Sequence, residues 1–344
     1  PGGLTGSWGA SYGGFGGGQT GATQASAAAY GSALQPTQPG SATSGSGYTR
    51  TAGGGALRID VSNTLQLDGL ISADGVTLSG DNQPGATGGS LWVSTRVLRG
   101  AGRFTANAAD SGVNTDAGSS AGGRIAVYYA DASGFSDFTA TTASAGKITN
   151  KNNGGTSGQD GTVAFIDTSV TNGALNVYQR FSLYPSETMH FGAAYFSNQA
   201  ELDMGGGSQL QVDGLLSLTD GTSVAAASLN AYTSGQPTPN YYQGVTFTAG
   251  SMVLDDLSSI SADGGGYTVS SGWFGSGPGG YTCTWGSDGA SYGGKGSGVH
   301  SPDAYGSVQS PIDLGSASAV GTDGGGAVRL AVSGAFQFDG LITA

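Results

Sequence analysis

The chain of 344 residues contains 67 glycines, close to one residue in five, where about 7% is usual. Charged residues amount to 10%, against roughly 25% in an average protein. The glycines follow no three-residue period, which excludes a collagen triple helix. The net charge of −12 argues against a nucleic-acid or anionic-membrane partner, which would require a basic face. Strong helix formers such as Glu, Lys and Met are scarce, so the composition predicts an all-β protein. The chain also contains no apolar run near the ~20 residues that a membrane span needs.

Residues 1–52 form a glycine- and aromatic-rich region with little strand signal. Its aromatic residues are frequent in a background with few other side chains, so we expect compact, ordered loops in which rings cover glycine backbone. The alternative is a flexible linker. The aromatic residues are Trp8, Tyr12, Phe15, Tyr30 and Tyr48.

Residues 53–167 repeat a short motif in which glycine precedes alternating apolar residues. Gly55, Gly89, Gly123 and Gly161 fall in one column, with spacings of 34, 34 and 38 residues. Alternation over five to seven residues, rich in β-branched and aromatic types, predicts strands with one buried face. We therefore expect β coils with a 34-residue period over 53–167.

A second column follows each predicted strand by about 14 residues. It reads as a hydrophobic residue, then Ser or Thr, then Ala. The three expected members are the triplets 71–73, 104–106 and 138–140. The segments between the strands carry the Gly, Asn, Asp, Ser and Pro residues typical of turns and loops.

Residues 168–204 break the rhythm, and we expect an irregular aromatic segment there. Residues 205–264 resume it as further β coils. The string LQLDGLISADG (65–75) recurs with variation at 210–221, 253–264 and 336–344, each time around an Asp-Gly-type corner. We interpret the Asp-Gly steps as structural corners that supply φ > 0. The aspartates concerned are Asp68, Asp74, Asp160, Asp213, Asp220, Asp263, Asp288, Asp323 and Asp339.

Residues 265–323 are a second copy of the glycine- and aromatic-rich region, and 324–344 begin the next β-coil repeat. PGGLTGSWGASYGG at residue 1 returns as PGGYTCTWGSDGASYGG at residue 278, and the string at 53–73 returns at 324–344. The chain thus holds one long repeat of about 275 residues and the opening of a second. We expect it to be a segment of a longer tandem array.

Short strands that cannot bury an apolar face alone can do so by stacking along an axis. The fold that we predict is therefore all-β: a parallel β-helix or β-solenoid-like tandem repeat with glycine-rich, aromatic-containing loops. An array of β-sandwich domains is the alternative, because Asp-Gly also forms hairpin turns.

Residues that could carry catalysis are few, and we predict no catalytic, cofactor-binding or metal-binding site and no enzyme. The two histidines, His190 and His300, are 110 residues apart and lie in no recognisable motif. The adjacent pair Asp255-Asp256 is the only candidate for a paired-carboxylate site, and alternation in a strand would send the two side chains to opposite faces.

No cofactor is expected, although the corner aspartates leave a structural calcium ion open, because calcium takes carboxylate and carbonyl oxygens. The chain lacks the recognised calcium-loop motifs. The single Cys283 cannot form an internal disulfide, and we expect it to be an inert residue rather than a free reactive thiol or an intermolecular link.

The strings GGSLWV and GGRIAVYY and the GLISADG tails resemble the glycine-rich repeats of large secreted or surface proteins of the β-helical adhesin and filament-forming type. The resemblance covers 53–166 and returns at 205–221, 250–264 and 324–344. It implies an extracellular or cell-surface location and a structural or adhesive role without catalysis.

The function that we predict is a non-catalytic structural repeat segment of a long extracellular fibre or surface filament, self-assembling by stacking of repeated β units. Its partners would be neighbouring repeats or copies of itself, with glycans or a cell surface as further candidates. The alternatives are an adhesin or carbohydrate-binding module that uses exposed Trp and Tyr, and a polysaccharide lyase or hydrolase.

Overall fold

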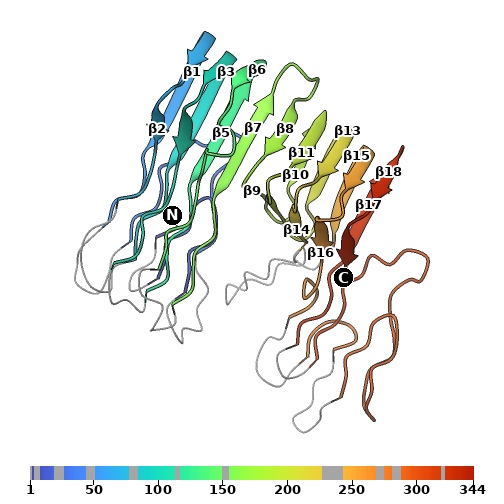
Figure 1. The fold of residues 1–344 in the computed structure, drawn as a ribbon. Coiled ribbons are helices and arrows are strands. Elements are labelled where there is room, and N and C mark those ends of the chain that lie inside the picture. Colours follow the sequence, from blue (N-terminus) through green and yellow to red (C-terminus); the bar gives the residue numbers. More distant parts are fainter. Residues whose placement is uncertain are drawn as a thin grey trace. The chain divides into compact units, whose positions relative to one another are not determined.

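The computed structural model contains strands and no helix within the residues that it describes. The chain divides into two compact units, unit 1, Pro1–Phe181, and unit 2, Ser182–Ala344, whose strands are labelled in Figure 1. The all-β prediction is confirmed. The described residues are 2–3, 8–18, 27–43, 51–76, 84–112, 117–148, 155–226, 243–268, 275–280, 288–318 and 322–344.

Unit 1 is built on parallel strands that follow one another along the chain. β1, β3, β5 and β7 form a parallel sheet, with β6 beside the end of β3, and β2 pairs with β4 in a second, parallel sheet. β8 joins β7 in an antiparallel ladder. The strands are β1 Ala56–Gln66, β2 Leu70–Ser72, β3 Ser90–Gly100, β4 Arg103–Thr105, β5 Arg124–Tyr129, β6 Asp131–Phe135, β7 Thr162–Asp167 and β8 Ala174–Val177.

The register of the main sheet reproduces the predicted glycine column. Ala56 pairs with Ser90, Ser90 with Arg124, and Arg124 with Thr162. The residues that precede these four are Gly55, Gly89, Gly123 and Gly161. The predicted spacing of these strands over 53–167 is therefore confirmed at three successive strand pairs. Each main-sheet strand, together with the second-sheet segment that follows it, is called a coil below.

The second column is confirmed at its first two members and wrong at the third. Ile71 pairs with Phe104, as expected. Thr105, however, bridges to Thr142, so the third member is 141–143 rather than 138–140. Residues 138–140 form the turn that follows β6 and so do not join the column, and Phe138 packs against the core instead.

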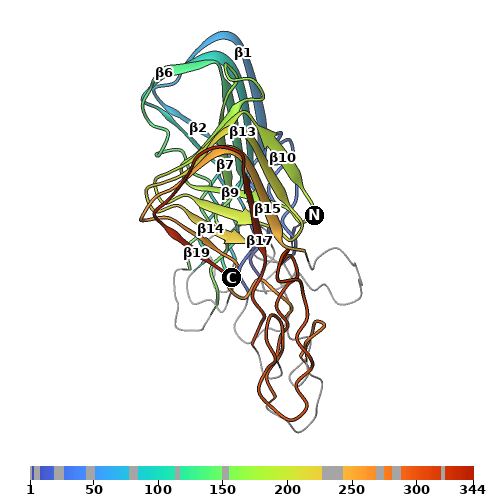
Figure 2. The same ribbon diagram turned by 90° about the vertical axis from the view of Figure 1, so that its right-hand side faces the viewer.

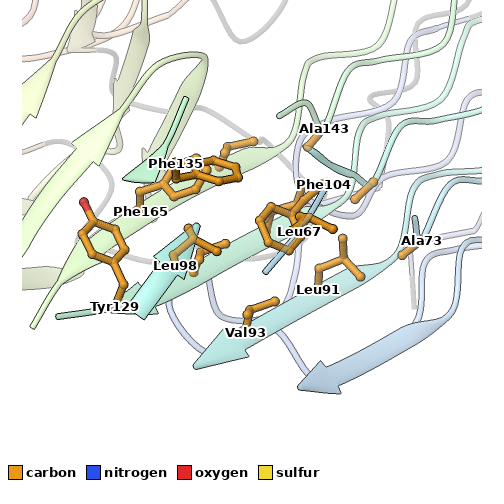
Figure 3. Close-up of a cluster of buried hydrophobic side chains, with 14 residues drawn as sticks. Leu67, Ala73, Leu91, Val93, Leu98, Phe104, Tyr129, Phe135, Ala143 and Phe165 are labelled. Carbon is orange, nitrogen blue, oxygen red and sulfur yellow. The ribbon is translucent and has the colours of Figure 1, made fainter. Parts of the chain in front are cut away.

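The core of unit 1 lies between the two sheets. Alternate side chains of β3, β5 and β7 point inward and are fully buried, and the alanines of the second column lie on the other side. Figure 3 shows Leu91 and Val93 of β3 with Phe104 and Phe165 in this cluster. Each buried aliphatic or aromatic side chain contributes about 1.5–3 kcal/mol, so every coil adds its own share of core.

Unit 2 also consists of two parallel sheets. β13 pairs with β10, β11 and β15, and β15 pairs with β17 and β18; β12, β14, β16 and β19 form the second sheet. Figure 2 separates the two sheets, with β13, β15 and β17 in one and β14 and β19 in the other. The strands are β10 Thr188–Phe191, β11 Ala193–Phe196, β12 Glu201–Met204, β13 Gln209–Leu218, β14 Ser223–Ala226, β15 Val245–Leu254, β16 Ser259–Ser261, β17 Val328–Val332, β18 Phe336–Phe338 and β19 Leu341–Thr343, while β9, Arg180–Leu183, spans the boundary.

The prediction of an irregular segment over 168–204 is wrong. This stretch contains β8 to β12, and its three phenylalanines lie in these strands. Phe181, Phe191 and Phe196 are all buried. The strands here are only four residues long, too short for alternation to be visible in the sequence.

The Asp-Gly steps differ from the prediction in the backbone φ of their glycines, which was expected to be positive. All nine glycines of these steps lie in the described residues, and only Gly221 and Gly264 among them have positive φ, at 79° and 66°. Asp213-Gly214 is not a corner: it lies within β13, at the register shift between Val212 and Leu215. The corner of this coil is Asp220-Gly221.

The ladders also bear on the alternative architecture. β-sandwich domains are built from antiparallel sheets, whereas β1, β3, β5 and β7 pair in parallel in unit 1, and β13 with β15 and β12 with β14 and β16 do so in unit 2. The parallel pairing argues against an array of sandwiches.

Candidate functional site

The histidines each contact one aspartate at the surface. His190 Nε2 lies 2.7 Å from Asp213 Oδ1 on the neighbouring strand, and His300 Nδ1 lies 3.3 Å from Asp288 Oδ2. Both imidazoles are largely exposed, with side-chain exposures of 46% and 67%. A solvent-exposed pair of this kind contributes little stability. That neither histidine is catalytic stays a prediction.

The carboxylate of Asp255 hydrogen-bonds both within its own turn and to the neighbouring coil. It accepts hydrogen bonds from Ser258 Oγ at 2.5 Å and from the backbone N–H of Asp220 at 2.7 Å. Burial raises the pKa of Asp255, but the hydrogen bonds from Ser258 and from backbone N–H groups outweigh it and lower this pKa below its ordinary value. A general acid requires a raised pKa, so the geometry suits a structural corner.

Within the described ranges there is no group of three His, Cys, Asp or Glu side chains that could hold a metal ion. Calcium binding stays an open prediction. Cys283 lies outside the described residues, as do Tyr48, Trp273, Phe274, Tyr281 and Trp285. No helix in the described part of the chain has the length and apolarity to span a membrane.

The most constrained feature of unit 1 is the stacking of glycine backbone between coils. Gly89, Gly123 and Gly161 donate N–H bonds of 2.7–2.8 Å to the carbonyls of Ala73, Ala106 and Ala143. Each bond connects the end of a second-column segment to the start of the main-sheet strand that follows it in the chain.

The neighbouring glycines lie so close to other backbone that no side chain fits. A Cβ at Gly54, Gly88 or Gly122 would overlap the same alanine carbonyl oxygens. The hydrogen that replaces the side chain therefore points at a carbonyl, as in the Cα–H···O contacts between adjacent strands. At these positions glycine is needed for close approach rather than for positive φ.

The loops of the first glycine-rich region are held by a buried tyrosine–arginine network. The rings of Tyr12 and Tyr30 are 4.7 Å apart, and Tyr12 is fully buried. Arg124 of β5, also fully buried, donates from Nε to Tyr30 O at 3.0 Å and from Nη1 to Thr162 Oγ1 at 3.0 Å. The Tyr12 hydroxyl bonds Ser90 Oγ of β3. One charged side chain thus fixes two loop segments to two coils.

The second copy of this region repeats the loop contacts in unit 2. Tyr292 and Tyr305 take the places of Tyr12 and Tyr30, with ring centroids 5.1 Å apart. In both copies the later tyrosine donates its N–H to the carbonyl of the earlier one, at 3.1 and 2.9 Å, and places its hydroxyl on a serine, Ser41 or Ser316. The expectation of compact loops is confirmed for the described part of 1–52, whereas residues 288–313 of the second copy keep the tyrosine contacts but are largely exposed.

Sequence reasoning noted these tyrosines but missed the network that they form. The available signal was the recurrence of Ser-Tyr-Gly-Gly at residues 11 and 291. The burial of Arg124 carried no such signal, because its loop partners Tyr30 and Tyr12 are 94 and 112 positions away in the sequence.

Comparisons with protein-family models, with curated proteins and with solved structures found no match to this chain.

Proposed function

We propose that the chain is a non-catalytic structural repeat segment of a long extracellular fibre or surface filament, with its coils arranged as a β-solenoid. The observation that carries the proposal is the parallel register of successive coils, with one glycine column running through β1, β3, β5 and β7. A stack of this kind grows by one strand spacing, about 4.8 Å, per coil.

The coils would stabilise one another in the way that the units of a repeat protein do. Each coil buries its apolar face only against its neighbours, so stability comes from stacking and favours extended arrays. Glycines that interlock with the backbone of adjacent coils leave little room for a ligand. The function would then be the length and stiffness of the stack itself.

The other functions find less support among the described side chains. Asp255 is tied into a corner, which suits the non-catalytic role. Trp92, a candidate sugar-stacking platform, is half-buried and lies under the guanidinium of Arg58 at 4.1 Å. The extracellular location follows from the sequence resemblance alone.

Electron microscopy of the purified protein tests the proposal. We expect filaments with a regular axial repeat, formed increasingly as the protein concentration rises. Short, monodisperse particles at high concentration would count against a fibre-forming role, and release of reducing ends from polyuronides would revive the enzyme alternative.

A further inference from the structure

The two copies of the loop network have the same internal geometry but different surroundings. Gly2 and Gly279 each donate N–H to a serine hydroxyl, Ser41 or Ser316, at 3.1 and 2.8 Å. The N–H of Gln35 bonds Ser32 Oγ as that of Ser310 bonds Ser307 Oγ, both at 3.0 Å. Gly31 and Gly306 have φ of 79° and 88°. Where both copies are described, residues 279–316 therefore correspond structurally, and not only in sequence, to residues 2–41.

In unit 1 these elements rest on the coils that follow them. Gly13 donates its N–H to Gly122 O at 3.0 Å, and a Cβ on Gly13 would overlap the carbonyl of Gly123. The next residue, Gly14, is similarly enclosed, since its Cβ would lie 2.6 Å from Asp160 O. The loop is closed over by backbone from 117–123 and 155–160.

In unit 2 the corresponding surface is open. A Cβ on Gly293 or Gly294 would have no heavy atom within 4 Å, although these residues match Gly13 and Gly14. Tyr292 is partly exposed where Tyr12 is fully buried. Among the described residues, none covers Gly293 and Gly294 of the second copy as 117–123 and 155–160 cover the first.

The open surface is apolar. Val308 is 99% exposed, whereas Ala33 at the matching position is 3% exposed. Exposed apolar side chains recur on β18 and β19, which form the edge of their sheets among the described strands. The rings of Phe336 and Phe338 on β18 lie side by side, with centroids 5.7 Å apart. Ile312 and Leu341 are further exposed apolar side chains of these residues. Apolar side chains exposed in contiguous patches mark interaction sites.

We infer that the described residues of 278–344 form a docking surface for a second copy of the coil block 74–167, added in the register that β1 makes with β3. Unit 1 supplies the template: Leu57 pairs with Leu91, and Val328 occupies the place of Leu57 in the repeated string. The inference rests on the proposed function and specifies how one repeat is joined to the next. The added coils would cover Val308 and Phe336 and enclose Gly293 and Gly294.

The test is a chain in which a second copy of residues 74–167 follows Ala344, compared with the original chain by hydrogen–deuterium exchange. We expect amides in 288–298 and 328–338 to exchange at least about tenfold more slowly in the extended chain. Unchanged exchange in both segments would overturn the inference. An added block that stays unfolded beside an intact surface would overturn it too, because the same coils fold on the matching elements of unit 1.

Gly293→Ala provides the matched variant. In the original chain it should leave the melting temperature unchanged, because the added methyl group meets open space. In the extended chain it should remove the gained protection, because the methyl group would overlap the carbonyl that corresponds to Gly123 O. Equal exchange with and without the substitution in the extended chain would contradict the inference. Filament formation is not a readout, so failure of docking and failure of the fibre are seen separately.

Discussion

At the scale of single residues, glycine does two different jobs in this chain. At Gly221 and Gly264 it provides positive φ, but between the coils it provides room for a neighbouring carbonyl. The composition shows that glycine is abundant and the column shows where it recurs. Neither distinguishes the two roles, because close approach depends on backbone from another coil.

Gly122→Ala tests the close-approach role. The new Cβ would overlap Ala143 O, a backbone atom that cannot rotate away, so we expect a loss of about 3 kcal/mol in the free energy of unfolding. Urea denaturation measures it. Gly55→Ala is the control, because a Cβ there has nothing within 4 Å, and it should change stability little. Equal effects of the two substitutions would contradict this explanation.

Substitution of Arg124 tests the loop network. The guanidinium of this fully buried residue donates hydrogen bonds to carbonyl groups of two loops and to Thr162. Lysine cannot reproduce the planar, multiply donating geometry, so Arg124→Lys should cost about 2–3 kcal/mol by leaving buried acceptors unsatisfied. Thermal unfolding with Arg58→Lys as the exposed control checks this. A change within about 0.5 kcal/mol for both variants would show that the network is dispensable.

The buried tyrosine Tyr128 of β5 should make the stability of the fold decrease at alkaline pH. Burial raises the pKa of Tyr128 to about 12, from an ordinary value of 10. The unfolded chain therefore loses this proton at lower pH than the folded chain. The stabilisation is fully present below pH 10 and is lost as the pH rises toward 12. Denaturation across this range should show a decline that is shallower in Tyr128→Phe; an identical slope in the two proteins would refute the assignment.

At the scale of elements, the sequence predicted the strands that recur at a regular spacing and missed the short strands that do not. The column through Gly55, Gly89 and Gly123 was correct because alternation and spacing agreed. The triplet 138–140 matched the column both in residue types and in spacing, and it was wrong because the chain reaches the column three residues later, so that the true partners of 104–106 lie at 141–143. Short strands within 168–204 gave too little alternation for detection.

The aromatic cluster that closes the core of unit 1 gives an element-scale prediction. Phe165 of β7 is fully buried and lies against Phe138, with ring centroids 4.9 Å apart. Phe165→Ala should cost about 3–5 kcal/mol in the free energy of unfolding. Phe336→Ala, at a position that is 40% exposed, should cost much less in the same urea titration. A similar loss for both would place the core elsewhere.

At the scale of the whole molecule, the sequence predicted a long repeat, and the tyrosine loops of the two copies share several internal hydrogen bonds. What the sequence could not provide is the environment of each copy. The strings SYGGFGGG and SYGGKGSG are nearly identical, yet Gly13 is enclosed and Gly293 is open. That difference depends on which coils lie against each copy. It is the basis for the inference that further coils dock on the second copy.

The central claim is that stacked β coils build a filament, and X-ray diffraction from oriented material tests it most directly. In a β-solenoid filament the strands lie across the long axis, so we predict a meridional reflection at about 4.7–4.9 Å, the spacing of neighbouring strands. Protein that stays monodisperse when concentrated, or fibres whose strand-spacing reflection lies away from the meridian, would contradict the claim.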